Sequence, residues 1–190
     1  MIDNLKIADF FIKKAIDSKF KGEYMSNLKL QKLMYYAYVW LFALQGERLF
    51  EEKLEAWPLG PVLPSLYHNF KNGDRPIEVI ETDPELLPDD IKEYLDSIWH
   101  SYGQYSALAL VNIVHREAPW VHAYNSNNTK KIITDESILD FYTESRASNL
   151  LPMNTVITFY NDKKTLMPLS DEIIRRIETP EYEDFDINTL

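Results

Sequence analysis

Histidine and carboxylate side chains are the groups that could do chemistry in this chain, and their spacing indicates which chemistry that would be. The four histidines are His68, His100, His115 and His122. None forms a His-x-x-x-His or His-Glu-x-x-His pair, so the sequence does not favour a zinc hydrolase. The chain has no cysteine, which excludes disulfides, thiolate metal ligands and a cysteine nucleophile. We therefore expect no metal site.

One group of side chains could still converge, namely His115, Glu117 and His122 around Pro119 and Trp120. We expect His115 to be a structural hydrogen-bonding residue rather than a ligand or a base, since no nucleophile accompanies it. The sequence has no nucleophile elbow, Walker loop or dinucleotide fingerprint, and only five glycines. We predict no catalytic residue, no cofactor and no enzymatic activity. An enzyme working around His115 remains the alternative.

The segment from Glu55 to Tyr67 is a candidate for binding rather than for catalysis. Prolines and a glycine follow Trp57 closely and favour a rigid, non-repetitive surface. This surface is either a packed turn or an anchor for a protein partner, because exposed Trp and Tyr are common at interface hot spots. Both interpretations stay open. The predicted partner-binding residues here are Trp57, Leu59, Pro61, Pro64 and Tyr67.

Two charged stretches have weaker functional interpretations. Lys29, Lys32 and Arg48 could form a small basic patch, although we expect a solvated helix start. Residues 181–190 alternate acidic with apolar side chains, and such a tail is usually loosely ordered in isolation. Its acids could steer a basic partner, while apolar groups anchor it. The tail could instead fold back on its own domain. The predicted anchors are Tyr182, Phe185 and Ile187.

The residues above must be positioned by helices, of which the central one spans Leu28 to Leu44. No residue from Leu33 to Leu44 is charged, so this helix must be covered on most sides. The run is too short to cross a bilayer, which needs roughly 20 apolar residues. We expect Ser26 or Asn27 to cap its start and Gly46 to close its end.

Apolar spacing and turn residues predict the other elements. Arg48–Phe50 and Leu54–Trp57 are expected to be two short strands joined by a tight turn. Pro58, Gly60, Pro61 and Pro64 should then prevent a regular ladder, and Pro119 should open a short turn. Residues 77–80 are expected to be extended. Helices are predicted at 4–18, about 62–71 with Pro61 in the first turn, 91–101, from the Ser106 cap to about 115, and 135–144 after Thr134, with Ile138, Leu139 and Tyr142 inward.

The predicted fold class is mainly α, a compact multi-helix domain around one central buried helix. It includes a small β-hairpin element and a short α/β C-terminal appendage. We divide the chain into a helical domain at 1–145 and an extension at 146–190. The extension contains a strand candidate at 156–160 and a short helix at 170–177.

Composition and net charge indicate which class of molecule this protein can bind. The 190 residues include 45% hydrophobic residues, enough for a sizeable core, and a formal net charge of −10. Such a charge repels nucleic acid, so we expect no direct tight DNA binding and a basic protein partner instead. The start of the sequence has no signal-peptide pattern, and we expect a cytoplasmic protein with no membrane association.

Several short motifs occur in order along the chain and resemble one family. The chain resembles the Panacea domain, also described as SocA-like or GepA-type, over about residues 2–142. Met34 and Val39 depart from the expected pattern, and the segment after Tyr142 lies outside it. The motifs are Lys29-Leu30-Gln31-Lys32-Leu33, Tyr35-Tyr36-Ala37, Glu55-Ala56-Trp57, Gly60-Pro61-Val62 with Tyr67, Tyr102-Gly103, and His115 with Glu117, Pro119-Trp120 and Ala123.

The resemblance implies an antitoxin from a bacterial or phage toxin–antitoxin pair. It would neutralise a cognate protein toxin, encoded by the adjacent gene, through direct binding. The alternative that the resemblance implies is an adaptor that delivers the toxin to a protease and engages a chaperone. We find no helix-turn-helix candidate outside the core.

Overall fold

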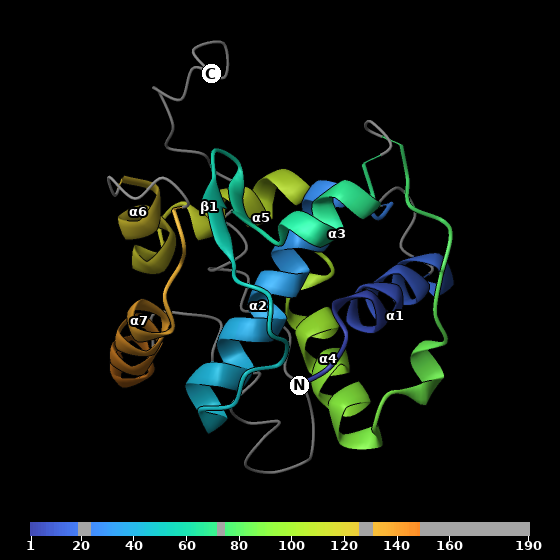
Figure 1. Cartoon of the computed structure of the whole chain (residues 1–190), viewed down its shortest axis with the longest axis horizontal. Helices are drawn as coiled ribbons and strands as arrows, with labels where there is room; N and C mark the ends of the chain where they lie inside the picture. The colour runs from blue at the N-terminus through green and yellow to red at the C-terminus, as the bar shows by residue number, and fades with distance from the viewer. Residues whose placement is uncertain (19–23, 72–74, 126–130, 149–190) are drawn as a thin grey trace.

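A computed structural model describes the backbone of residues 1–18, 24–71, 75–125 and 131–148, with side chains described up to Tyr142. Its centre is helix α2 (Asn27–Gln45), which is surrounded by other elements on most sides (Figure 1). The Ser26 hydroxyl accepts from the Lys29 N–H at 3.1 Å and caps its start. Gly46 closes its end in the left-handed region with φ 72°. The predicted central helix and both of its caps are confirmed.

Four helices pack against α2 and bury its apolar side chains. They are α1 (Asn4–Asp17), α4 (Asp89–Tyr102), α5 (Ala107–Val114) and α7 (Asp135–Ser148). Leu30, Ala37 and Leu41 are all buried, as expected for a helix that is covered on most sides. The mainly α fold with a small hairpin is confirmed, and within the described residues no helix is long and apolar enough to span a membrane.

The hairpin lies one segment later than the sequence suggested. Strand β1 (Glu55–Trp57) pairs with β2 (Gly60–Val62) in an antiparallel register. Residues 48–50 are not a strand, and the prolines do not prevent a ladder, since Pro61 sits within β2. The missing proline N–H is tolerated because this strand lies at the edge of a two-stranded sheet. Pro64, rather than Pro61, begins the next helix, α3 (Pro64–Asn69).

Other differences are smaller. Pro119 lies inside helix α6 (Ala118–Asn125) rather than opening a turn, because proline is tolerated in a first helical turn. A short 3-10 helix, η1 (Pro84–Leu86), precedes α4. Leu139 is 36% exposed rather than inward, whereas Ile138 and Tyr142 are buried. The predicted elements at 156–160 and 170–177 fall outside the described residues.

Candidate partner-binding site

The hairpin is held from α2 by a lysine that the sequence had suggested to be solvated. Lys32 has no exposed surface, and its Nζ donates to the Pro61 carbonyl at 2.8 Å. Burial lowers the pKa of this amine to about 7. A Cβ atom on Gly60, which has φ 103°, would lie 2.7 Å from the Lys32 Cε. Glycine is therefore needed here both for the turn and for the lysine beneath it.

A second α2 side chain holds the chain where the hairpin leads into α3. The Gln31 Oε1 accepts from the Leu63 N–H at 2.8 Å, and its Nε2 donates to Asn27 at 3.2 Å. Asn27 in turn donates to the Tyr67 carbonyl at 3.0 Å. Gln31 and Lys29 are buried along with Lys32, and Arg48 donates to Asp135 at 2.9 Å. Neither the possible basic patch nor the expected solvated helix start is present, because Lys29 and Lys32 are buried and Arg48 is paired with Asp135.

The opposite side of the hairpin is held by the α5–α6 corner. The indole Nε1 of Trp120 donates to the Trp57 carbonyl at 3.1 Å. The His115 ring stacks on Trp120 with centroids 4.0 Å apart and hydrogen-bonds the backbone at Pro58. Burial, together with the nearby charge of Lys32, lowers the pKa of His115 to about 4. The imidazole is therefore neutral at pH 7 and supports the turn.

The backbone of β1 is paired along its other edge as well. The Ala56 N–H donates to the Lys131 carbonyl at 2.8 Å, and the Ile133 N–H donates to the Leu54 carbonyl at 2.9 Å. Glu55 and Ile132 form an isolated antiparallel bridge. Contacts within this chain thus fix the hairpin from three directions.

The tip of this fixed hairpin is open. Pro58 is exposed and Leu59 is 41% exposed. Trp57 and Tyr67 are half-buried and meet edge to face, with ring centroids 4.9 Å apart. The Trp57 Nε1 donates to Glu55 at 2.9 Å. An amphipathic surface of two aromatic rings and one leucine results.

The structure places the predicted binding residues unequally. Trp57, Leu59 and Tyr67 lie at or beside the tip, and Pro64 is half-buried at the start of α3. Pro61 is buried, with its carbonyl facing Lys32. The predicted tail anchors Tyr182, Phe185 and Ile187 lie outside the described residues.

A buried carboxylate ties the helices beneath the hairpin together. Glu117 is 1% exposed, and its two oxygens accept from Tyr35 at 2.7 Å, Tyr36 at 2.9 Å and Tyr142 at 2.9 Å. Burial raises the pKa of Glu117 to about 7, although the three phenols act in the other direction. Tyr102 stacks on Tyr36 with centroids 3.9 Å apart. The cluster joins α2, the start of α6 and α7.

This cluster changes how the histidine group is interpreted. The carboxylate of Glu117 is occupied by phenols, and His122 is exposed. The three residues His115, Glu117 and His122 therefore do not form one catalytic group. Among the described residues, no set of histidine and carboxylate side chains could hold a metal ion.

Sequence reasoning missed how these polar residues are used. Gln31 had appeared only as part of a motif, Lys32 only in a motif and a possible surface patch, and Trp120 and Glu117 only in a motif and beside histidines. A signal was present, because Tyr35 and Tyr36 place two hydroxyls on a helix otherwise surrounded by apolar groups. Buried hydroxyls need partners, and a carboxylate is a strong acceptor.

Comparison with known proteins assigns the class. A family described as "Antitoxin SocA-like, Panacea domain" matches residues 30–121, which include α2, the hairpin and the α5–α6 corner. The chain belongs to this family of SocA-like antitoxins. It is 30% identical over 145 residues to antitoxin SocA of Caulobacter vibrioides (strain NA1000 / CB15N), covering 67% of this chain and 77% of that relative. No solved structure matches.

Proposed function

We propose that this protein is the antitoxin of a toxin–antitoxin pair and neutralises a cognate protein toxin by direct binding. The observation that carries the proposal is a convergence within the family region. Gln31, Lys32, His115 and Trp120 all point their polar groups at one hairpin and its flank. The surface that this arrangement presents, at Trp57, Leu59 and Tyr67, is aromatic and accessible.

Preorganisation is the physical reason for placing the toxin at this tip. Binding normally orders loops and side chains, and that ordering lowers affinity. Here the turn backbone is already fixed at Trp57, Pro58 and Pro61 by side chains beneath it. Trp57 and Tyr67 offer large contact area with few rotatable bonds, which is typical of interface hot spots. Pro64 borders the same surface.

We assign the second part of the toxin contact to the C-terminal residues Tyr182, Phe185 and Ile187. Their acidic neighbours and the net charge of −10 favour a basic partner. The family region ends at residue 121, so the tail lies where partner specificity can vary. The partner is the product of the adjacent gene, and both proteins act in the cytoplasm.

Binding by the tip is tested with purified adjacent-gene product and titration calorimetry. Leu59→Asp and Tyr67→Ala should each weaken binding about tenfold or more, since truncating a hot-spot residue costs about 2 kcal/mol or more, and about 1.4 kcal/mol is a tenfold change in affinity. Leu86→Asp serves as the matched control, because Leu86 is 70% exposed on η1, away from the hairpin. Unchanged affinity in folded Leu59→Asp and Tyr67→Ala variants would remove the tip from the interface.

Three further measurements test the contribution of the tail and distinguish direct neutralisation from the two rival mechanisms. Removing residues 181–190 should weaken toxin binding and reduce its salt dependence, and unchanged affinity would exclude the tail. Toxin half-life in cells should not shorten when this protein is present. A shortened half-life would instead support delivery to a protease. A folded His115→Ala variant that binds toxin normally yet no longer protects cells would support an enzyme.

A further inference from the structure

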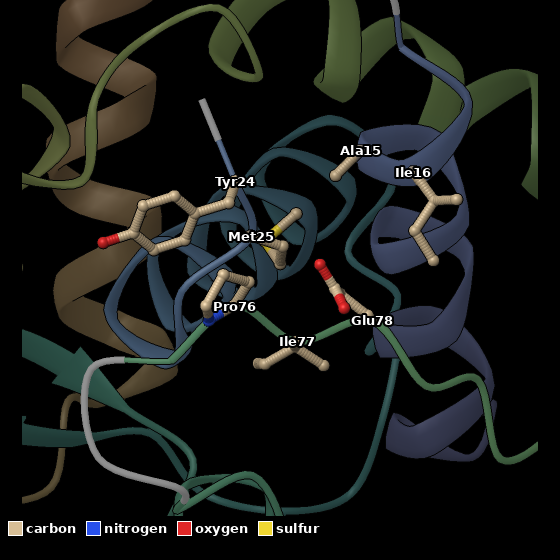
Figure 2. Close-up of a pocket in the computed structure, with 7 residues that line it drawn as sticks. All are labelled: Ala15, Ile16, Tyr24, Met25, Pro76, Ile77 and Glu78. Carbon is tan, nitrogen blue, oxygen red and sulfur yellow. The ribbon is translucent and has the colours of Figure 1, made fainter. Parts of the chain in front are cut away.

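An apolar pocket lies on the side of the molecule away from the hairpin. It is lined by Ala15 and Ile16 at the end of α1, by Tyr24 and Met25 before α2, and by residues 76–78. Its volume is about 300 Å³. Figure 2 shows Ile16, Tyr24 and Pro76 around the opening, with Met25 and Ile77 nearby.

The exposed apolar side chains around this pocket form a patch. Ile16 and Tyr24, which line the pocket, are 49% and 53% exposed, and Val79, the residue after the lining residue Glu78, is 69% exposed. Met25 and Ile77 beneath them are buried and belong to the hydrophobic core. The patch is therefore a surface extension of the core, and clustered exposed apolar groups of this kind mark interaction sites.

The backbone beside the pocket is an unpaired edge. Residues 75–81 run without a turn or bend along the right side of Figure 1. The Ile77 N–H donates to the Met25 carbonyl at 2.8 Å, and the Glu81 N–H donates to Asp9 at 3.1 Å. Between these two points, the N–H and C=O groups of Glu78 and Ile80 have no hydrogen bond within the described part of the chain, and they face the edge opposite to the one that Ile77 uses, because alternate residues of an extended chain face the same edge. Such groups are a template for an added strand.

A single carboxylate gives the pocket its charge preference. Glu78 is the charged residue among those that line the pocket, and its side chain points between Met25 and Ile16 in Figure 2. It has no ion pair or hydrogen bond among the described residues. A carboxylate beside apolar walls favours a ligand that carries a cation next to an aliphatic group.

We propose that this edge, residues 76–80 with the adjoining pocket, docks an extended segment of a protein partner in which aliphatic and basic residues alternate. The segment pairs its backbone with Glu78 and Ile80, inserts an aliphatic side chain against Ile16 and Tyr24, and places a lysine or arginine at Glu78. Main-chain pairing supplies affinity in this binding mode, while pockets for alternate side chains supply specificity. The surface is distinct from the hairpin tip and does not depend on it.

The probe is a fluorescein-labelled octapeptide that alternates valine with lysine, and its matched control alternates valine with glutamate. Fluorescence anisotropy with the full-length protein at physiological salt measures both affinities. We expect the lysine peptide to bind at least tenfold tighter. N-methylation of every second peptide amide, in the register that faces the protein, should abolish binding. Equal binding of the N-methylated peptide would overturn the strand pairing and with it the proposal.

Variants separate the pocket from the general attraction of an acidic protein for a basic peptide. Ile16→Asp and Glu78→Lys should each weaken the lysine peptide at least tenfold. Leu108→Asp and Glu136→Lys are the matched controls, both exposed residues on other helices, and should leave affinity within twofold. Similar losses from Glu136→Lys and Glu78→Lys would show non-specific electrostatics and overturn the proposal.

A second copy of this chain is the alternative occupant of this edge. Sedimentation of the wild-type protein and of Ile16→Asp distinguishes it. A wild-type dimer that Ile16→Asp dissociates, together with no binding of the lysine peptide, would overturn the proposal in favour of an interface between two copies. A monomer in both cases, with peptide binding as above, supports it. Loss of toxin binding by the hairpin variants leaves these peptide affinities unchanged, so the two proposals fail independently.

Discussion

The hairpin and the edge at residues 76–80 are both non-helical segments lying against the helices, yet they are held in opposite ways. The hairpin backbone and its flank are hydrogen-bonded by four buried or half-buried side chains, Gln31, Lys32, His115 and Trp120. The edge is held at one end by a single carboxylate, Asp9, which accepts from Glu81 and Thr82. The two segments therefore differ in how many buried side chains anchor their backbone, and we expect only the edge to change when it binds a partner.

The largest expected effect comes from removing the carboxylate beneath the hairpin. Glu117→Ala should lower the free energy of unfolding by about 3–5 kcal/mol, because three buried phenols lose their acceptor and a cavity remains. Glu117→Gln should cost less than half as much, since its amide oxygen still accepts. Urea unfolding measures both. Near-equal losses in the two variants would show that packing, and not hydrogen bonding, governs this cluster.

The buried amine of Lys32, which lies beneath the hairpin, predicts that the free energy of unfolding depends on pH. Its pKa of about 7 in the folded protein is below the usual 10.5, so the unfolded chain binds more protons between these values. Stability should therefore rise with pH by about 1.4 kcal/mol per unit between roughly pH 8 and 9.5. Lys32→Met should remove this rise, while Lys13→Met, at an exposed position, should keep it. A slope that persists in Lys32→Met would contradict the burial of a titrating amine.

The acid side of the profile has the opposite sign. The pKa of Glu117 is raised to about 7 from 4.5, so the folded protein binds more protons between these values. Its contribution to stability is present below pH 4.5 and is lost as pH rises through 7. Glu117→Gln should remove this trend. Comparing Glu117→Gln with Lys32→Met should therefore separate the acid part of the stability profile from the alkaline part.

The smallest of these effects belongs to Asp9, the side chain that anchors the end of the edge. Asp9→Ala removes three hydrogen bonds, from Glu81 N–H, Thr82 N–H and the Thr82 hydroxyl, but also relieves a fully buried carboxylate. We expect a loss of about 1–2 kcal/mol. Amide exchange at Thr82 should accelerate, while exchange at Leu63 should not. Asp17→Ala, at an exposed position on the same helix, should change stability by less than about 0.5 kcal/mol. Faster exchange at Leu63 would show that the two segments are coupled.

The helical framework was predictable because its signals are local. A long apolar run, the Ser26 and Gly46 caps and the apolar stripe of α4 each determine an element within a few residues. The hairpin was misplaced because Pro61 normally argues against a strand, and only the two-stranded edge position makes it acceptable. The role of Lys32 was not predictable, since its acceptor is a carbonyl at residue 61, brought close by the fold. From its position on the helix alone, Lys32 was expected to be exposed to solvent.

The Glu117 cluster also determines when the domain can be completed during synthesis. Its hydrogen bonds join residues separated by 82, 81 and 25 positions in the chain. Long-range contacts of this kind form late, because loop closure precedes any gain from them. Tyr142 lies beyond the family match at residues 30–121, yet it supplies one of the three donors. Until that tyrosine has left the ribosome, the central helix α2 lacks part of its covering, and a nascent chain halted before this point presents a surface that chaperones and proteases recognise.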